Sequence, residues 1–211
     1  MRLAALPFVL LAVQPFHASV QPVPAPVRAE LAGPFWHSGC PVPLSHLRLL
    51  SVSYWDFAGH IQTGQLVVNE AAASPLARVF RRLYELRFRI RHMQVSDAYG
   101  PKAARPADGD VTDAFECRGA VPSPCTGGKS TGSWSQHAYG LAVDINPIEN
   151  PYVGCGRSRE RASRPYLDRT RIRRGMVTPA VVQAFRAIGW GWGGAWSGST
   201  QDYMHFSASG H

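Results

Sequence analysis

Asp144 stands inside the apolar run Leu141–Ile145, in a stretch that otherwise has the pattern of a buried strand. A carboxylate without a partner would be costly to remove from water at such a place. The fold must therefore supply a partner for it, which can be a salt bridge, a hydrogen-bond network or a metal ion. This requirement constrains the fold more than any other single feature of the chain.

Size and composition favour one globular domain with a basic surface. The chain has 211 residues, of which 45% are hydrophobic and 17% are charged, and this balance excludes a disordered chain. The formal net charge of +8 favours anionic partners, either nucleic acid or an acidic polymer such as a bacterial cell wall. Charge alone does not choose between these two classes.

The N-terminal sequence is typical of an exported protein. Arg2 precedes an apolar run over residues 3–13, which is too short to span a bilayer and fits a secretory signal peptide. Ala18 and Ala25 are both candidate last residues of that signal. We expect three segments: a leader over residues 1–25, a Pro-rich linker without a core-forming pattern over 26–38, and one folded domain over 39–211.

Four cysteines in an exported chain predict two disulfides. No C-x-x-C spacing is present, so a structural zinc site made of cysteines is not expected. The sequence leaves three pairings open. We favour Cys40 with Cys117 and Cys125 with Cys155, because the second pair flanks the segment around Asp144 and would hold it from both sides.

Hydrophobic periodicity predicts an α+β fold with a small antiparallel sheet and flanking helices. A helix is expected over residues 75–88, with Ser74 as its N-cap and Pro75 in its first position. A second helix should begin at Pro179 after the cap Thr178 and stop at Gly189. Strands are expected over residues 47–57, 64–69 and 141–145.

Two histidines have acidic neighbours at suggestive spacings. His137 lies seven residues before Asp144, and Gly140 between them permits a turn that brings both side chains to one point. His205 follows Asp202 by three residues, which requires a bend if both face one site.

A His/Asp/His set is a complete protein ligand shell for catalytic zinc, with a fourth position left for water. His137, Asp144 and His205 would form that set, and a Zn²⁺ ion would then compensate the carboxylate in the apolar run. A salt bridge between Asp144 and one of the many arginines is the alternative that the residues leave open.

Several motifs together resemble the D-alanyl-D-alanine carboxypeptidase family of zinc peptidases. The resemblance is carried by SQHAYGLAVDINP and GWGWGGAWSGSTQDYMHF, and it also includes YWDFAGHIQTGQLVVN and AFECR. The family includes vancomycin-resistance carboxypeptidases and phage L-alanyl-D-glutamate endolysins, and it shares its fold with the Hedgehog signalling domain. The resemblance runs from about Gly39 to Phe206.

The resemblance implies roles for individual residues. His137, Asp144 and His205 match the zinc ligands, and Asp202 matches the catalytic carboxylate. Arg118 matches an arginine that reaches into the substrate site, where it would stabilise the oxyanion or bind the substrate carboxylate; a structural salt bridge is its alternative role. Three further residues either contact substrate or only pack in the fold: Ser135, Tyr139 and Trp192.

The resemblance also implies a function. We expect a secreted, monomeric zinc peptidase without a membrane span that cleaves the D-Ala-D-Ala terminus of peptidoglycan stem peptides and also contacts an anionic wall polymer. Cleavage of L-Ala-D-Glu bonds or of cross-links is the alternative reaction. A non-catalytic wall-binding module of the same fold is the alternative class. Export and disulfides argue against nucleic acid as the partner.

Overall fold

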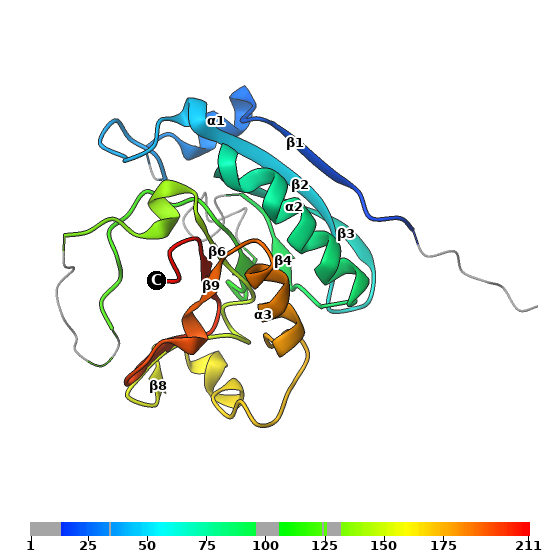
Figure 1. Cartoon of the computed structure of the whole chain (residues 1–211), viewed down its shortest axis with the longest axis vertical. Helices are drawn as coiled ribbons and strands as arrows, with labels where there is room; N and C mark the ends of the chain where they lie inside the picture. The colour runs from blue at the N-terminus through cyan, green and yellow to red at the C-terminus, as the bar shows by residue number, and fades with distance from the viewer. Residues whose placement is uncertain (1–13, 34, 96–105, 124, 126–131) are drawn as a thin grey trace, which may run out of the picture.

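The structure is a computed structural model, and it describes residues 14–33, 35–95, 106–123, 125 and 132–211. The apolar run over residues 3–13 lies outside these ranges, so the predicted leader is described only from Gln14 onward. Figure 1 shows the course of the chain. The α-helices and strands are β1 (Ala18–Pro22), α1 (Ala25–Leu31), β2 (Leu47–Trp55), β3 (Ile61–Asn69), α2 (Glu70–Glu85), β4 (His92–Met93), β5 (Val111–Thr112), β6 (Ala142–Asp144), β7 (Tyr152–Gly154), β8 (Arg157–Ser158), α3 (Pro179–Arg186), β9 (Gly191–Trp192), β10 (Thr200–Asp202) and β11 (His205–Ser207).

The predicted α+β class is confirmed, with several small antiparallel sheets in place of one. The largest has the order β1-β2-β3, and the order of the others is β6-β11-β9 and β10-β7-β8, while β4 and β5 form a short parallel pair. In Figure 1, α2 lies across the β1-β2-β3 sheet and α3 lies beside α2. The main core fills the space between them and includes Phe80, Phe185 and Phe206.

Residues 26–38 do not form the expected linker. Helix α1 begins directly after its N-cap Pro24, and Pro26 is tolerated in its first turn, where the missing N–H has no partner to lose. Val23, Leu31 and Phe35 are buried in a second core cluster. The expectation of a segment without a core-forming pattern is therefore wrong, although the boundaries of the leader and the folded domain stay predictions.

Helix α2 begins five residues earlier than predicted. Asn69 is its N-cap, and the side chain of Asn69 accepts a hydrogen bond from the N–H of Ala71. Pro75 consequently lies inside the helix and not at its first position, and the helix ends at Glu85. Helix α3 confirms the second prediction, because Pro179 is its first residue and Gly189 follows its end with a left-handed φ of 82°.

The two disulfides join the cysteines in the favoured pairing. Cys40 bonds to Cys117, and Cys125 bonds to Cys155. The first bridge joins the segment that follows α1 to the residue directly before Arg118. The second ties the residues after Val121 to the end of β7.

Gly140 joins the N-terminal sheet to the C-terminal half of the chain. Its φ of 66° is left-handed, and a Cβ atom placed there would lie 2.6 Å from the backbone nitrogen of Asn69. The N–H of Asn69 donates to the carbonyl of Gly140 over 2.9 Å, and the side-chain amide of Asn69 donates to the carbonyl of Tyr139 over 3.0 Å. Only glycine fits this junction without displacing β3.

Gly140→Ala is therefore expected to lower the free energy of unfolding by more than the roughly 1–2 kcal/mol that left-handed backbone alone costs an alanine. Gly189→Ala is the matched control, because Gly189 is also left-handed but has no atom within 4 Å of the added Cβ. Denaturant unfolding of both variants measures the difference. Equal losses in the two variants would contradict a steric role for Gly140.

Candidate metal centre

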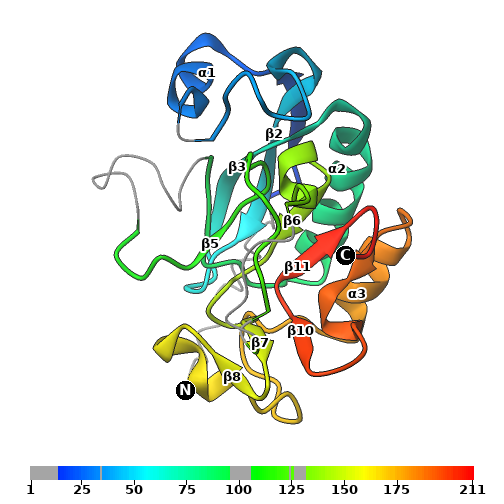
Figure 2. The same cartoon turned by 90° about the vertical axis from the view of Figure 1, so that its left-hand side faces the viewer.

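Asp144 and His205 face each other across two strands. Strands β6 and β11 are antiparallel and place these two residues directly opposite, so their side chains leave the same face of the sheet. Figure 2 shows β6 and β11 side by side. The Nδ1 atom of His205 lies 3.0 Å from Oδ1 of Asp144. The predicted bend is present, because β10 ends at Asp202 and β11 begins at His205.

His137 reaches the same point from a short 3₁₀ helix, Gln136–Tyr139. The hydroxyl of Ser135 caps this helix by accepting from the N–H of His137. Gly140 ends the helix and turns the chain into β6. The Nε2 atom of His137 then lies 3.2 Å from Oδ1 of Asp144 and 3.2 Å from Nδ1 of His205.

A backbone carbonyl fixes the tautomer of His137. The Nδ1 atom of His137 lies within hydrogen-bond distance of the carbonyl oxygen of Ala114, so Nδ1 donates to that carbonyl and Nε2 faces Asp144 and His205. Histidines that bind metals are commonly oriented in this way, by a carbonyl or carboxylate that accepts from the second ring nitrogen. Ala114 thus has a role that the sequence pattern did not indicate.

The three side chains fit a divalent metal. A tetrahedral zinc site with bonds of about 2.0 Å has ligand–ligand edges of about 3.3 Å, close to the three separations above. Both imidazoles are buried, and only 14% of the Asp144 side chain is exposed. His37, Cys40 and Cys117 also converge, but their two sulfur atoms are joined in the first disulfide.

In the metal-free triad, the charges of His137 and Asp144 each shift the pKa of the other residue. Burial raises the pKa of Asp144, but the charge of His137 and the hydrogen bonds from both histidines outweigh it and hold that pKa far below its usual range. Burial lowers the pKa of His137, yet the charge of Asp144 and its hydrogen bond raise it to about 9. Without a metal, the carboxylate is therefore compensated by an imidazolium at neutral pH.

Asp202 stands beside the triad with an unsatisfied oxygen. Its Oδ1 atom is buried and has no hydrogen-bond partner among the described residues, and the same holds for Nε2 of His205. Burial and the charge of Asp144 raise the pKa of Asp202 well above its usual range. A buried carboxyl oxygen without a partner, next to a candidate metal site, is suited to exchanging a proton with a bound molecule.

Arg118 lines the cavity onto which His137, Asp144 and His205 open. Its Nε donates to Oε2 of Glu116 over 2.6 Å, and its Nη1 lies 3.4 Å from the carbonyl of Gly119. The structure thus shows the salt bridge that was the alternative role of Arg118. These contacts use Nε and Nη1, and Nη2 has no hydrogen-bond partner among the residues that the structure describes. Burial lowers the pKa of Arg118, but the charge of Glu116 outweighs burial, so the pKa is raised overall.

The triad opens onto a cavity of about 490 Å³. His137, Asp144, His205, Asp202, Arg118 and Ser135 all line it. Two residues considered for substrate contact are not among the lining residues. Tyr139 packs against the second core cluster, and Trp192 packs against the main core and stacks on Phe206.

The cavity also contains residues that the sequence reasoning did not single out. Asp113 forms an isolated backbone bridge with Asp144, with N···O distances of 3.2 and 3.0 Å. Burial and the charge of Asp144 raise its pKa to about 7 against the opposing charge of His137. Trp134 and Tyr152 add aromatic surface. The only feature of the sequence that could have pointed to Trp134 as a site residue is its position directly before Ser135.

The fold thus brings together three buried side chains that could hold a divalent metal ion. Residues 128–208 match the family model described as D-alanyl-D-alanine carboxypeptidase. The segment that carries the three candidate ligands and Asp202 is therefore similar to that family, and the resemblance drawn from the sequence is confirmed there. Arg118 lies outside the matched segment. No curated protein and no solved structure matches the chain.

Metal binding is expected to compete with protons. Because the pKa of His137 is about 9 in the metal-free protein, a metal must displace a proton at any lower pH. The zinc affinity should therefore fall about tenfold for each pH unit below 9. Competition with a chromophoric chelator between pH 6 and 9 measures this slope. His205→Ala should abolish retention, whereas exposed His60→Ala should not; equal retention in both variants would contradict the site.

Proposed function

We propose that the protein is a secreted zinc peptidase that removes the terminal D-alanine from peptidoglycan stem peptides. The observation that carries the proposal is the convergence of His137, Asp144 and His205 to mutual distances of 3.0–3.2 Å at the floor of a cavity. The family match supports a peptide as the substrate class. Two disulfides support an oxidising, extracytoplasmic compartment.

Zinc suits the donor set, because two imidazoles and one carboxylate leave a fourth position for water or substrate. When bound, zinc would supply Lewis acidity and favour the ionisation of water near neutral pH. His137, Asp144 and His205 would hold it, and the Ala114 carbonyl would keep His137 in the binding tautomer.

Asp202 would act as the general base and then as the general acid. Its buried Oδ1 lacks a partner and can accept the proton of the attacking water. Its raised pKa makes the carboxylate a stronger base than an exposed aspartate. The same oxygen would pass the proton to the amine of the leaving D-alanine.

Arg118 would bind the terminal carboxylate of the substrate. It is the only arginine or lysine among the described residues that line the cavity. Glu116 holds its Nε, so the guanidinium presents its remaining N–H groups in a fixed orientation. This arrangement favours a substrate with a free C-terminus over an internal peptide bond.

No described helix is long and apolar enough to cross a membrane. The monomeric state and an anionic wall polymer as a second partner remain proposals, and the +8 net charge supports the polymer.

The reaction is tested by release of D-alanine from a stem pentapeptide, with and without a chelator. The expected result is release that stops with the chelator and returns with zinc. A pentapeptide amidated at its C-terminus is the matched control and should react poorly, because it offers Arg118 no carboxylate. Equal cleavage of both peptides would favour the endopeptidase alternative. Wall binding without product would favour the non-catalytic module.

Asp202→Asn is expected to keep the metal and to lose about 10²–10⁴-fold in kcat, because the amide cannot accept the proton. Asp168→Asn is the matched control, since Asp168 is exposed and interacts with Thr170 outside the cavity. Metal content and pentapeptide turnover are measured on both variants. Near-wild-type turnover of Asp202→Asn would remove Asp202 as the base.

A further inference from the structure

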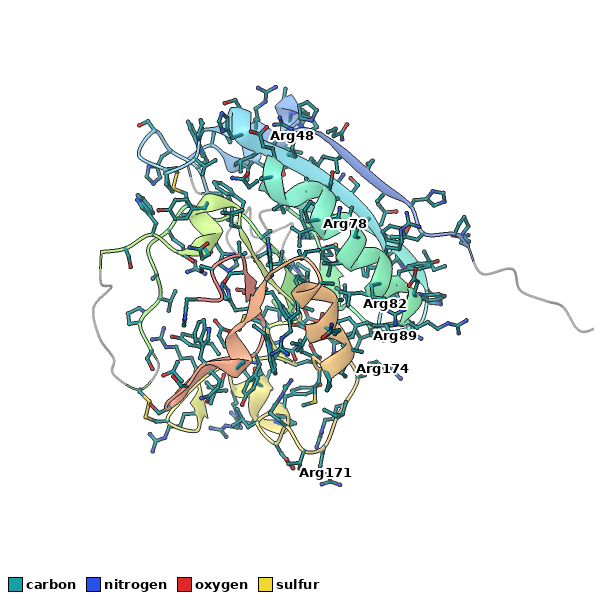
Figure 3. All side chains as sticks on the ribbon, in the orientation of Figure 1. Arg48, Arg78, Arg82, Arg89, Arg171 and Arg174 are labelled. Atoms are coloured by element: carbon teal, nitrogen blue, oxygen red, sulfur yellow. A yellow bond between two sulfur atoms is a disulfide. The ribbon has the colours of Figure 1, made fainter. Side chains whose placement is uncertain are left out.

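The end of the molecule where α2 stops carries a concentration of arginines. We call this surface the arginine end and define it by Arg81, Arg87, Arg89, Arg171, Ile172 and Arg174. Figure 3 shows Arg89 and Arg174 close together near the end of α2, and Arg171 at the bottom of the view, three residues before Arg174 in the chain. Arg89 and Arg174 donate to the adjacent carbonyls of Asp56 and Phe57, over 3.2 and 2.8 Å.

Aromatic rings hold several of these guanidinium groups at the surface. Arg81 lies 5.0 Å from the ring centre of Phe16, and Arg87 and Arg89 each lie 5.4 Å from that of Trp55. Such cation–π contacts fix the side chains without neutralising their charge. The arginines therefore remain available to an anionic partner.

Few acidic groups oppose this charge. Glu85 is paired with Arg82 at 3.1 Å, and Asp56 accepts from the N–H of His60 and the side chain of Gln62. Asp168, which is exposed, interacts with both Arg171 and Arg173. Asp110 and Glu149 are fully buried and paired with Arg91.

The chemistry of the cations points to phosphate. The chain has 22 basic residues of these two types, and all of them except Lys102 and Lys129 are arginines. The planar guanidinium binds phosphate oxygens with two parallel hydrogen bonds, whereas an ammonium acts as a point charge. A row of arginines is thus well matched to a surface of phosphodiester groups.

Exposed apolar side chains distinguish a lipid surface from a dissolved polymer. Ile172 is 57% exposed between arginines, and Leu86 at the end of α2 is 36% exposed. These side chains gain free energy only if the partner offers an apolar layer beneath its charges. The first described residue, Gln14, also lies near the end of α2, because the hydroxyl of Tyr84 donates to its carbonyl. The sequence before Gln14 is apolar.

We propose that the arginine end binds the headgroups of an anionic lipid bilayer, with Ile172 inserted at the headgroup level. In Figure 1 the chain enters on the right, near the end of α2, whereas the C-terminus, whose His211 lines the cavity, lies on the left. A protein bound in this way holds its cavity away from the membrane. The lipid contact is independent of the proposed peptidase activity, and only the benefit of this orientation rests on it.

The test is co-sedimentation of the full chain with vesicles of phosphatidylglycerol or of phosphatidylcholine. Binding is expected to phosphatidylglycerol alone. The triple variant Arg81→Gln, Arg87→Gln and Arg171→Gln should weaken it roughly a hundredfold, from about fivefold for each arginine near an anionic surface. The matched control removes the same charge from three other exposed arginines: Arg157→Gln on β8, Arg159→Gln in the bend after it, and Arg161→Gln at the start of the 3₁₀ helix Arg161–Tyr166. It should weaken binding far less.

Ile172→Ser separates a bilayer from a dissolved phosphate polymer. It should weaken vesicle binding and leave binding to soluble polyphosphate unchanged, whereas Val20→Ser, at a residue 42% exposed on β1, should change neither. Equal losses in the two arginine triples would show a net-charge effect and overturn the proposal. So would unchanged vesicle binding by Ile172→Ser. Pentapeptide turnover, measured in parallel, tests the proposed function separately.

Discussion

The interaction on which the site depends is the compensation of the Asp144 carboxylate by two imidazoles. Strand pairing brings His205 opposite it, and a capped 3₁₀ helix with a left-handed glycine brings His137 above it. Each partner needs the other, because the loss of one would leave an uncompensated charge in a buried site. The same geometry that stabilises the metal-free protein therefore also prepares a set of metal ligands.

A second buried network supports the turn that follows Asp144. Arg91 donates to Asp110 over 2.9 Å and to Glu149 over 2.8 Å, and both carboxylates are fully buried. Asn146, with a φ of 46°, donates to the carbonyls of Arg89 and Gly175. These bonds connect the residues before β5 to the residues after β6, and this places Asp113 against Asp144.

Sequence reasoning reached the ligands because each has a local signal. An aspartate in an apolar run, a glycine between His137 and Asp144, and a histidine shortly after an aspartate all mark departures from simple strand patterns. It failed where a residue acts through its backbone or through one isolated contact. The carbonyl of Ala114 and the bridge of Asp113 leave no periodicity in the sequence.

The errors in the predicted elements have a related cause. Ser74 and Pro75 looked like the start of a helix, but Asn69 supplies a cap earlier and tertiary contact with Gly140 fixes it there. The prolines around residue 24 suggested a linker, yet they lead into a short helix whose apolar side chains complete the second core cluster. In both cases long-range packing decided between local alternatives.

If the predicted leader is removed, the pairing of β1 with β2 gives the position of the cut a structural consequence. Cleavage after Ala18 would leave residues 19–22 paired along β2, whereas cleavage after Ala25 would strip the strand and uncover a long row of backbone donors and acceptors. An uncovered edge of this kind recruits another strand, from a second copy or from a foreign chain. A cut after Ala25 would thus favour self-association more than a cut after Ala18.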